Sequence, residues 1–562
     1  MAVSTPTTGG GHLHPIRLWL ARHPYVTLTL VVVALLGPFL AKPFNIDDPL
    51  FIWAARQIQA HPADPYGFNV EWGWTKFPMW KVTENPPLAC YYLALAVGVL
   101  GWSEPALHLA LLLPALAVAW GTYRLAGRLC NQPMLAALAA IFTPVFLVSS
   151  TTVMCDVLML AFWVWAAVLW LEGAESGDAR RLFGAGILIA LAALTKYYGA
   201  CLMPLLAAYS VIARHRFRPW GACLLIPLAV LCAYQFATCA LYGSSLLYGA
   251  ADYAHFSKWL FGFSSVTTSL TALAFTGGCL AVAVFALPWL WRSRELLVIG
   301  GFAVLIAAIV FLDEGLLEKY RLLSPASFLP VKIQMIFWAT GGVCVLALAI
   351  TDCVRHRDAP SALLALWVLG TFLFAGFVNW TVNARSILPL APAVGILIAR
   401  RRELNDRIGC RPRTGTIAIG CAAAAGLAFV VAQADFRLAR AVRHCAREIG
   451  ARFEPGGARL WFQGHWGFQF YLQAAGASPV DVKTFAPQPG ARVAIPSNNT
   501  NLLPPNPAKT VLLETVMAAG PHLITTWSQT VGAGFYSSVW GPLPFAVGKV
   551  PGESVSVYAL QP

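Results

Sequence analysis

The sequence is poor in charge. Asp, Glu, Lys and Arg make up only 11% of its 562 residues, whereas about 25% is usual for a soluble chain. Hydrophobic residues make up 58%, and the mean hydropathy is +0.65. This composition excludes a water-soluble globule of this size.

Several familiar motifs are also missing. The sequence has no CxxC pair, zinc-like spacing, P-loop, GxGxxG, HExxH or internal repeat, which leaves common metal and nucleotide sites without support. Most of the thirteen cysteines lie inside apolar runs, where a thiol behaves as a small core hydrophobe. The polar C-terminal region holds only Cys445, so it cannot form a disulfide of its own.

The chain has an excess of positive charge, with a formal net charge of +14. Its basic residues lie between apolar runs and do not form one basic face, so the excess indicates membrane topology rather than nucleic-acid binding. The polar residues 1–23 lack a cleavable signal sequence and are predicted to form a cytoplasmic N-terminal segment.

Apolar runs long enough to cross about 30 Å of hydrocarbon recur as far as Gln433. We predict thirteen transmembrane helices, near residues 24–41, 105–126, 134–150, 156–172, 182–195, 198–213, 221–242, 268–291, 296–312, 330–350, 361–380, 386–400 and 414–433.

The apolar run Pro87–Leu100 is short, and we interpret it as a re-entrant or interfacial helix. Omitting it as a crossing places the arginine clusters between the spans on one side of the membrane, as the positive-inside rule requires. These clusters contain Arg17, Arg22, Arg124, Arg128, Arg180, Arg181, Arg214, Arg216, Arg218, Arg292, Arg294, Arg355, Arg357 and the cluster 400–413.

The predicted fold is therefore an all-α polytopic membrane domain over residues 24–433, with a first exoplasmic loop over residues 42–104. Beyond Gln433 the composition changes to an Arg-rich helix, Asp435–Arg452, followed by short apolar runs separated by Gly and Pro. This pattern predicts a small exoplasmic α/β domain over residues 434–562.

Unusual polar residues fall on the exoplasmic side of this topology: Asp47, Asp48, Asp156, Lys196 and Arg385. Each has a structural explanation, because Asp48 and Asp156 suit helix N-caps, Asp47 suits a solvated loop, and both bases suit interfacial anchors. Together they indicate more, because ionisable groups from distant segments at a membrane boundary need mutual pairing or a polar cavity.

Their chemistry suits group transfer from a lipid phosphate. Lys196 and Arg385 can bind a phosphate whose tail remains in the bilayer, and they can stabilise its growing charge as it leaves. Asp47, held just before a helix that starts near Pro49, can accept a proton from an acceptor hydroxyl. If the acceptor nucleophile is already ionised, Asp47 needs only to orient it.

The ordered set of motifs resembles the GT-C membrane glycosyltransferases, in particular bacterial protein O-mannosyltransferase-like proteins and lipid A aminoarabinose transferases. The resemblance covers about residues 24–400. It rests on the acidic pair after the first span, Asn85-Pro86-Pro87-Leu88 before an aromatic helix, Asp156, Leu194-Thr195-Lys196 and Arg385 before Leu388-Pro389.

The resemblance implies Asp47 and Asp156 as catalytic residues and a polyprenyl-phosphate sugar as donor. Inversion at the anomeric carbon is also implied. Lys196 and Arg385 match the family residues that hold the donor phosphate. The chain has Asn85 where many relatives have His, and Asp48 where Glu is usual, which leaves the acceptor and any divalent metal open. The implied location is the bacterial inner membrane, with a periplasmic C-terminal domain.

Two loops complete the predicted site. The Trp-rich segment 71–80 is either an aromatic belt at the headgroups or a platform for sugar or lipid. The outer loop 243–263, which contains His255 and Trp259, is placed to close over bound donor. We include Asp48, Asn85, Tyr197 and Trp259 as predicted substrate-binding residues. His465 and Trp466 are expected to pack locally.

The leading hypothesis is therefore an integral-membrane glycosyltransferase that transfers a lipid-linked sugar to an exoplasmic glycolipid, polysaccharide or protein. The alternatives are a transporter or flippase for a lipid phosphate, and a non-catalytic assembly or sensor protein that acts through its C-terminal domain. The missing internal repeat disfavours the transporter. No nucleic acid and no firm cofactor are implied.

Overall fold

The computed structural model describes residues 19, 22–83, 85–213, 217–262, 264–320, 328–407, 414–453, 459–486 and 490–561. Residues 1–18 of the predicted N-terminal segment lie outside this set, as do Arg17, Arg214, Arg216, Arg411 and Arg413 of the predicted arginine clusters.

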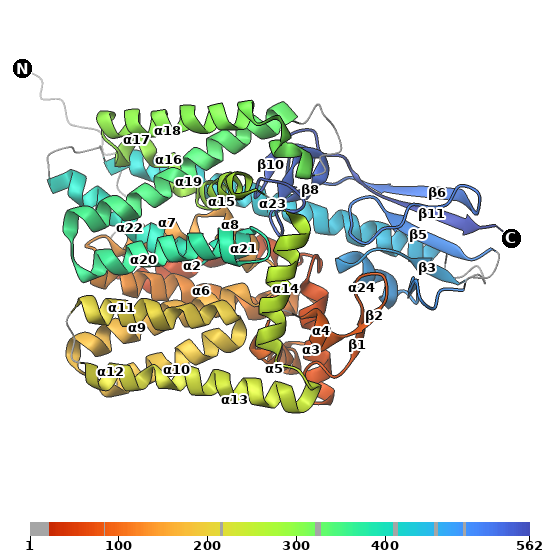
Figure 1. Ribbon diagram of the computed structural model, residues 1–562, viewed down its shortest axis with the longest axis horizontal. Coiled ribbons are helices and arrows are strands. Elements are labelled where there is room, and N and C mark those ends of the chain that lie inside the picture. The colour runs from red at the N-terminus through yellow and green to blue at the C-terminus, as the bar shows by residue number, and fades with distance from the viewer. Residues whose placement is uncertain are drawn as a thin grey trace, which may run out of the picture.

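Most of the chain forms a bundle of helices that lie side by side, and the C-terminal sheet projects from one end of it (Figure 1). We call this the sheet end. The helices of the bundle are α2 (Pro24–Leu36), α6 (Glu104–Leu129), α7 (Pro133–Ile141), α8 (Pro144–Ser150), α9 (Asp156–Ser176), α10 (Ala179–Thr195), α11 (Leu202–Ile212), α12 (Phe217–Cys223), α13 (Leu225–Tyr242), α15 (Ser265–Cys279), α16 (Ala281–Phe285), α17 (Leu287–Leu290), α18 (Ser293–Leu312), α19 (Phe328–His356), α20 (Ala359–Leu373), α21 (Ala384–Ile387), α22 (Leu390–Arg407) and α23 (Thr414–Phe453). Short 3-10 or π turns join them at η1 (Gly37–Phe39), η2 (Tyr197–Cys201), η3 (Glu314–Tyr320) and η5 (Phe374–Val378).

All thirteen predicted spans are helical. Seven described helices are long and apolar enough to cross a membrane. The number rises to nine if the two bent pairs, α7 with α8 and α14 (Leu246–Phe261) with α15, are each counted as one span. The other four predicted spans are α2, α10, α11 with η2, and α22. The first three are shorter than 18 residues, and α22 ends in a charged stretch.

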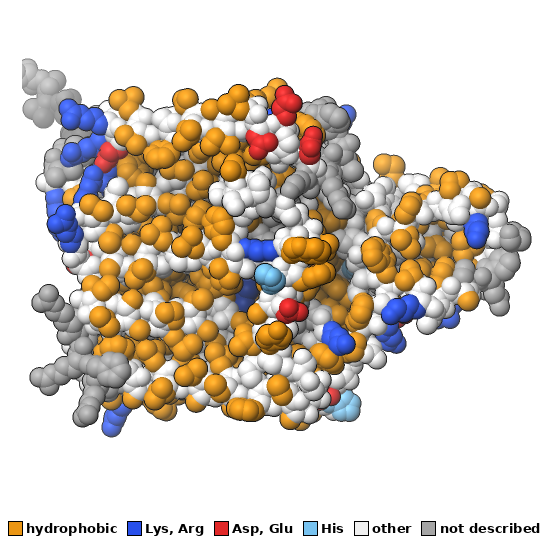
Figure 2. Space-filling view, viewed as in Figure 1, with side chains coloured by type: hydrophobic (Ala, Val, Ile, Leu, Met, Phe, Trp, Pro, Cys, Tyr) orange, Lys and Arg blue, Asp and Glu red, His pale blue; other side chains and the backbone are white. Residues whose placement is uncertain are grey.

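The arginine clusters described by the structure gather at the end of the bundle opposite the sheet, as Figure 2 shows for one face. Arg124 pairs with Glu172 at 2.8 Å, and Arg400 bonds to both the Leu129 carbonyl and Asp352. Glu172 lies sixteen residues along α9 from Asp156, or about 24 Å at 1.5 Å per residue. The arginines and Asp156 therefore lie at opposite ends of the bundle.

The first loop carries its own small structure at the sheet end. It contains α3 (Asp48–Ala60), the antiparallel hairpin β1 (Asn69–Glu71) and β2 (Lys76–Pro78), α4 (Met79–Val82), and α5 (Leu88–Leu100) over the run expected to be re-entrant or interfacial. Val99 and Leu95 on α5 are 86% and 76% exposed, so this helix presents apolar side chains outward.

The expected Arg-rich helix is not a separate element. It is the second half of α23, whose 40 residues run across the predicted domain boundary after Gln433. At 1.5 Å per residue, α23 is about 60 Å long, twice the thickness of the hydrocarbon core. One helix therefore joins the bundle to the C-terminal region.

The C-terminal region confirms the expected β-containing domain. Its five-stranded sheet has the order β4-β3-β5-β11-β6. Strand β3 is parallel to β4 and β5, and strand β11 is antiparallel to β5 and β6. The helix α24 (Trp466–Ala474) packs between this sheet and the bundle. The strands are β3 (Leu460–Phe462), β4 (Ser478–Pro479), β5 (Arg492–Pro496), β6 (Thr510–Ala518), β7 (Ile524–Thr525), β8 (Trp527–Ser528), β9 (Ala533–Gly534), β10 (Ala546–Val547) and β11 (Glu553–Leu560), with the turn η7 (Gln529–Val531).

The C-terminal region belongs to two hydrophobic cores. The sheet, α24 and the end of α23 share a small core that includes Phe462, Leu472 and Val557. The segment between β7 and β10 instead contributes to the bundle core, with side chains such as Phe535 and Leu543 fully buried there. The bundle thus includes part of the polypeptide expected to lie in the exoplasmic domain.

Candidate active site

The acidic pair lies where the first loop leaves η1, beneath α24. The backbone N–H of Phe44 donates to the Tyr471 hydroxyl at 2.9 Å. Gly467 allows this approach, because a Cβ there would lie 2.2 Å from the Phe44 carbonyl oxygen. The C-terminal region therefore fixes the chain just before Asp47.

Ile46 adopts a left-handed conformation with φ +47°. This is rare for a β-branched residue and costs about 1–3 kcal/mol, and strained residues of this kind cluster at functional sites. The two acids after it have different environments. The Asp47 side chain is 27% exposed, whereas Asp48 is completely buried.

The prediction of Asp48 as an N-cap is wrong by one residue. The helix α3 begins at Asp48, and Asp47 holds the N-cap position without a side-chain capping bond. Asp48 instead accepts hydrogen bonds from the backbone N–H groups of Asn45 at 2.9 Å and Val153 at 2.8 Å. Burial raises the pKa of Asp48 to about 7. This carboxyl ties the first loop to the turn that leads to Asp156.

Asp47 forms an ion pair with Arg385. The two side chains meet at 3.1 Å, and the second terminal nitrogen of Arg385 donates to the Met154 sulfur at 2.9 Å. The Arg385 side chain is only 14% exposed. Within the described part of the chain its Nε has no hydrogen-bond partner.

Asp156 forms a second ion pair, with Lys196, at 2.7 Å. Asp156 is the first residue of α9, and Lys196 follows the last residue of α10, so the antiparallel packing of these helices brings them together. Lys196 is 19% exposed and Asp156 is 1% exposed. The second carboxylate oxygen of Asp156 is buried and has no partner among the described residues.

The C-terminal segment holds the loop that carries Arg385. The N–H of Ala384 donates to the Phe535 carbonyl at 2.8 Å, and the N–H of Ser538 donates to the Val382 carbonyl at 2.8 Å. Residues that flank Arg385 are thus bonded to a segment about 150 positions later, which no short motif in the sequence reveals.

A buried ion pair beside these groups was missed by sequence reasoning. Lys42 and Asp435 meet at 2.5 Å, and both side chains are fully buried. Asp435 also accepts from Thr526 at 2.6 Å and from the Tyr536 hydroxyl at 2.9 Å. Lys42 directly follows the first span on the side where bases are otherwise scarce, the same signal that selected Lys196.

Besides Asp48, three other predicted substrate-binding residues lie outside the two ion pairs. The Asn85 carbonyl accepts from Tyr66 at 2.8 Å, and Tyr197 packs with Tyr234 at a ring distance of 6.4 Å. Trp259 lies on α14, is 74% exposed and packs on Phe256. The expected closing loop is therefore mostly the helix α14, which crosses the bundle in Figure 1. Their roles in binding remain predictions.

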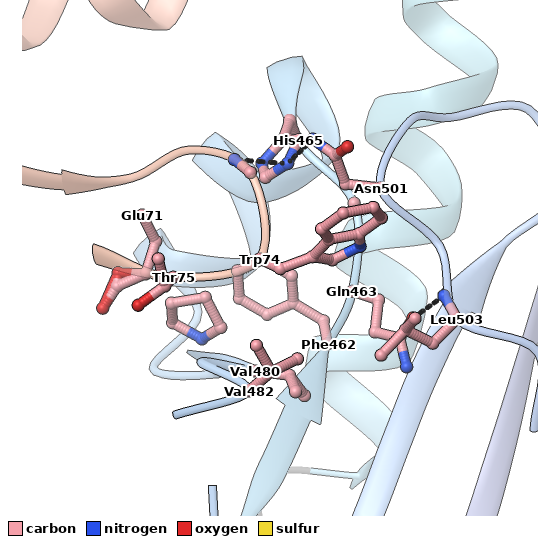
Figure 3. Close-up of a pocket in the computed structure, with 13 residues that line it drawn as sticks. Glu71, Trp74, Thr75, Phe462, Gln463, His465, Val480, Val482, Asn501 and Leu503 are labelled. Atoms are coloured by element: carbon pink, nitrogen blue, oxygen red, sulfur yellow. Dashed lines mark hydrogen bonds between the residues drawn. The ribbon is translucent and has the colours of Figure 1, made fainter. Parts of the chain in front are cut away.

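His465 packs locally, as expected. It stacks on Trp72 at a ring distance of 5.0 Å. It also accepts from the Gly73 N–H at 3.1 Å and contacts Asn501 at 2.9 Å, as Figure 3 shows. Burial lowers the pKa of His465 to about 4, so it is neutral near pH 7. The adjoining cavity of about 10 Å³ has room for a single water. This region joins the first-loop hairpin to the sheet.

No group of three or more His, Cys, Asp or Glu side chains that could hold a metal occurs among the residues that the structure describes.

The Trp-rich segment is only partly a surface feature. Trp72 and Trp80 stack on His465 and Tyr242, whereas Trp74 is 49% exposed.

Comparison with known proteins confirms the resemblance to GT-C enzymes. Residues 84–242 match the model of the dolichyl-phosphate-mannose-protein mannosyltransferase family, a GT-C type family. This region includes Asn85, Asp156, Lys196 and Tyr197. No curated protein sequence matches the chain.

Several solved structures are similar at low identity. The apo oligosaccharyltransferase of Archaeoglobus fulgidus matches with a TM-score of 0.47 and 14% identity over 82% of this chain, which spans 65% of that protein. ArnT from Cupriavidus metallidurans bound to undecaprenyl phosphate matches with a TM-score of 0.41 and 14% identity, over 85% of this chain and 93% of that one. The mycobacterial arabinofuranosyltransferase AftD matches with a TM-score of 0.43 and 13% identity, over 96% and 40%.

Proposed function

We propose that the protein is a membrane glycosyltransferase that moves a sugar from a polyprenyl-phosphate carrier to an acceptor on the exoplasmic side. The observation that supports it most directly is the meeting of two ion pairs, Asp47 with Arg385 and Asp156 with Lys196, at the sheet end of the bundle. The family match over residues 84–242 is consistent with this class of reaction.

The two cations suit the leaving phosphate. Arg385 can bind it in a fork and Lys196 as a point charge, and both retain some exposure to a ligand. The unpartnered Arg385 Nε is a further donor for an anion, since buried polar groups are rarely left unpaired. In the ligand-free protein the carboxylates neutralise these cations.

Asp47 suits the acceptor side of the reaction. An acceptor hydroxyl attacks the anomeric carbon, the bond from that carbon to the phosphate oxygen breaks, and its electron pair leaves with the polyprenyl phosphate. Asp47 takes the hydroxyl proton, or only orients the nucleophile if it is already ionised. Attack opposite the leaving group inverts the anomeric carbon. Asp156 holds Lys196 in place.

This role requires the sheet end to face the exoplasm and the arginine-rich end to face the cytoplasm, in a bacterial inner membrane. In this orientation residues 434–562 are periplasmic, and the N-terminal segment 1–23 is cytoplasmic. Asn85, Tyr197 and Trp259 are proposed to contact donor or acceptor, and Asp48 to fix the acidic loop.

The test separates donor binding from transfer. Purified full-length protein in nanodiscs is titrated with undecaprenyl phosphate, and native membranes are assayed with a panel of radiolabelled undecaprenyl-phosphate sugars. Asp47→Asn is expected to lower transfer by about 10²–10⁴-fold and to keep phosphate binding. Lys196→Ala and Arg385→Ala are expected to weaken that binding.

Arg128→Ala is the matched control, because Arg128 pairs with Glu175 at the opposite end of the bundle. It should leave both transfer and binding near the wild-type values. Full activity in all three site variants would refute the proposed function. Full activity in Asp47→Asn alone would leave the phosphate site standing and remove the base.

A further inference from the structure

A groove of about 430 Å³ lies beside the first loop, between α3, the β1–β2 hairpin and α24. This volume falls within the range of about 300–1,000 Å³ that is usual for small-ligand sites. None of the roles proposed above uses it. It shares only Glu71 with the lining of the small cavity beside His465.

The groove follows the helix that begins at the acidic pair. Trp53 and Gln57 line it from α3, five and nine residues after Asp48, or about 8 and 14 Å along the helix axis. A molecule in the groove therefore lies within the length of a few sugar units of the candidate reaction centre.

The lining combines flat rings with amides. Trp53 and Phe68 contribute aromatic surface, and Asn69 and Gln473 contribute side-chain amides. Within the described residues neither of these two amides has a hydrogen-bond partner, whereas the Gln57 amide donates to the Asp64 carbonyl at 3.2 Å. Aromatic rings next to unengaged donors and acceptors suit a hydroxyl-rich ring with one apolar face.

Basic side chains outnumber acidic ones in the lining of the groove, where Arg56 and Lys76 lie with the single carboxylate of Glu71. Arg56, on its wall, lies 5.0 Å from the Trp102 ring and 5.8 Å from the Phe470 ring. Phe470 contacts Tyr471 at 5.4 Å, and the Arg447 guanidinium lies 5.7 Å from the Tyr471 ring. Arg440 lies two helical turns before Arg447 on the same exposed face of α23.

These three guanidiniums differ from those of Arg443 and Arg452. Arg56, Arg440 and Arg447 contact only aromatic rings, with no carboxylate partner in the described parts of the chain. On the same helix, Arg443 pairs with Glu104 and Arg452 pairs with Glu448 and Glu514. The unpaired cations form a row that leads to the groove. Because no carboxylate of the described residues neutralises them, they are available to bind an anion.

The distance of the arginine row from the membrane indicates which kind of molecule binds there. The predicted apolar part of α23 ends at Gln433, so Arg440 and Arg447 lie about 10 and 21 Å beyond it. The headgroup layer extends only about 5–8 Å beyond the hydrocarbon core. An anion that reaches both arginines must therefore project well above the membrane surface.

We propose that this groove and the row Arg56–Arg447–Arg440 bind an anionic glycan, a chain of sugars with phosphate, sulfate or carboxylate groups. Its rings lie on Trp53 and Phe68, and its acidic groups lie on the three arginines. That this glycan is the acceptor rests on the proposed function. The binding itself does not.

The test uses full-length protein in detergent and fluorescein-labelled sulfated dextran, followed by fluorescence anisotropy. Neutral dextran of the same length and inorganic polyphosphate are the comparison probes. Wild-type protein should bind the sulfated dextran best. The triple variant Arg56→Ala, Arg440→Ala, Arg447→Ala should bind it at least about tenfold more weakly, because it lacks the three unpaired cations.

The matched control is the triple variant Arg128→Ala, Arg443→Ala, Arg452→Ala, which loses the same formal charge from paired arginines. It should bind nearly as well as the wild type. An equal loss of dextran binding in the control would show only a general electrostatic attraction to a basic protein, and it would overturn the proposed site. Equal binding of polyphosphate would overturn the glycan, and equal binding of neutral dextran would overturn the role of charge.

The variant Asp47→Asn separates this inference from the proposed function, because it should bind sulfated dextran normally while transfer is lost. If no sugar donor supports transfer but the row variant still loses binding, the glycosyltransferase fails and the glycan site stands.

Discussion

The ion pair between Lys42 and Asp435 is expected to be the strongest single link between the bundle and its C-terminal region. Both side chains are fully buried, and the N–O distance is 2.5 Å. In Asp435→Asn the Lys42 ammonium keeps only the Thr151 hydroxyl at 3.5 Å as a side-chain hydrogen-bond partner in the described chain. Removing one partner of a buried pair typically costs about 3–5 kcal/mol.

The size of this loss follows from which groups remain. The asparagine oxygen replaces only one of the two carboxylate oxygens. At the Oδ1 position it still accepts from Thr526, while its amide nitrogen takes the place of the oxygen that accepts from Tyr536 and Lys42. The loss therefore comes mainly from the buried ammonium that is left without a carboxylate. Lys42→Met should lower the stability by a similar amount, because it leaves the Asp435 carboxylate buried without a cation. The double variant removes both charges and should recover most of the stability, since a buried pair adds little over apolar or neutral groups of similar shape.

The assay is a double-mutant cycle on the thermal stability of the full chain in detergent, with unfolding followed by size-exclusion chromatography after heating. Each single variant should melt well below the wild type, and the double variant should melt above either single. Additive losses in the double variant would refute the coupling, and single variants within about 1 kcal/mol of wild type would refute the cost assigned to burial.

Other changes test the same arrangement. Gly467→Ala should destabilise the chain by about 1–3 kcal/mol and lower transfer, because its Cβ would lie 2.2 Å from the Phe44 carbonyl oxygen; a thermal melt of wild-type stability would contradict this contact. Truncation after Gly520 should abolish folding of the bundle in detergent, because Phe535 and Leu543 belong to its core; a monodisperse truncated bundle would contradict it. Burial raises the pKa of Glu553 to about 7, so the folded state binds a proton that the unfolded state releases near pH 4.5. Wild-type stability should therefore fall between about pH 4.5 and 7, and Glu553→Gln should flatten that fall; equal pH profiles by thermal melting would refute this prediction.

Helix positions could be predicted from the sequence because the bilayer imposes a length and an apolar composition on each span. All thirteen predicted segments are helical, and the arginine clusters that the structure describes gather at one end. Composition predicts a boundary after Gln433, but it cannot show that one helix continues unbroken from the apolar segment into the polar one. The helix α23 continues for 40 residues because its polar half packs on α24 and the sheet.

The pairing of the candidate site residues was only partly accessible. The sequence indicated that two acids and two bases meet at one boundary, and the structure pairs them as Asp47 with Arg385 and Asp156 with Lys196. Which acid pairs with which base depends on which helices pack as antiparallel neighbours. The bonds from Phe535 and Ser538 to the Arg385 loop are long-range backbone contacts, which leave no side-chain pattern to detect.

Burial separates two kinds of charge that the sequence treats alike. Lys42 and Lys196 both follow a span on the side poor in bases, so topology alone gives them equal weight. Lys42 is fully buried against a fully buried partner, and a phosphate could reach it only by breaking the link to α23. Lys196 is 19% exposed and Arg385 14% exposed, so a ligand can contact them while the fold stays intact. The same comparison favours Asp47 as the acid of the candidate site and favours a structural role for Asp48 and Asp435. A charge on the unexpected side of the membrane is thus a candidate for chemistry only where some of its surface remains open.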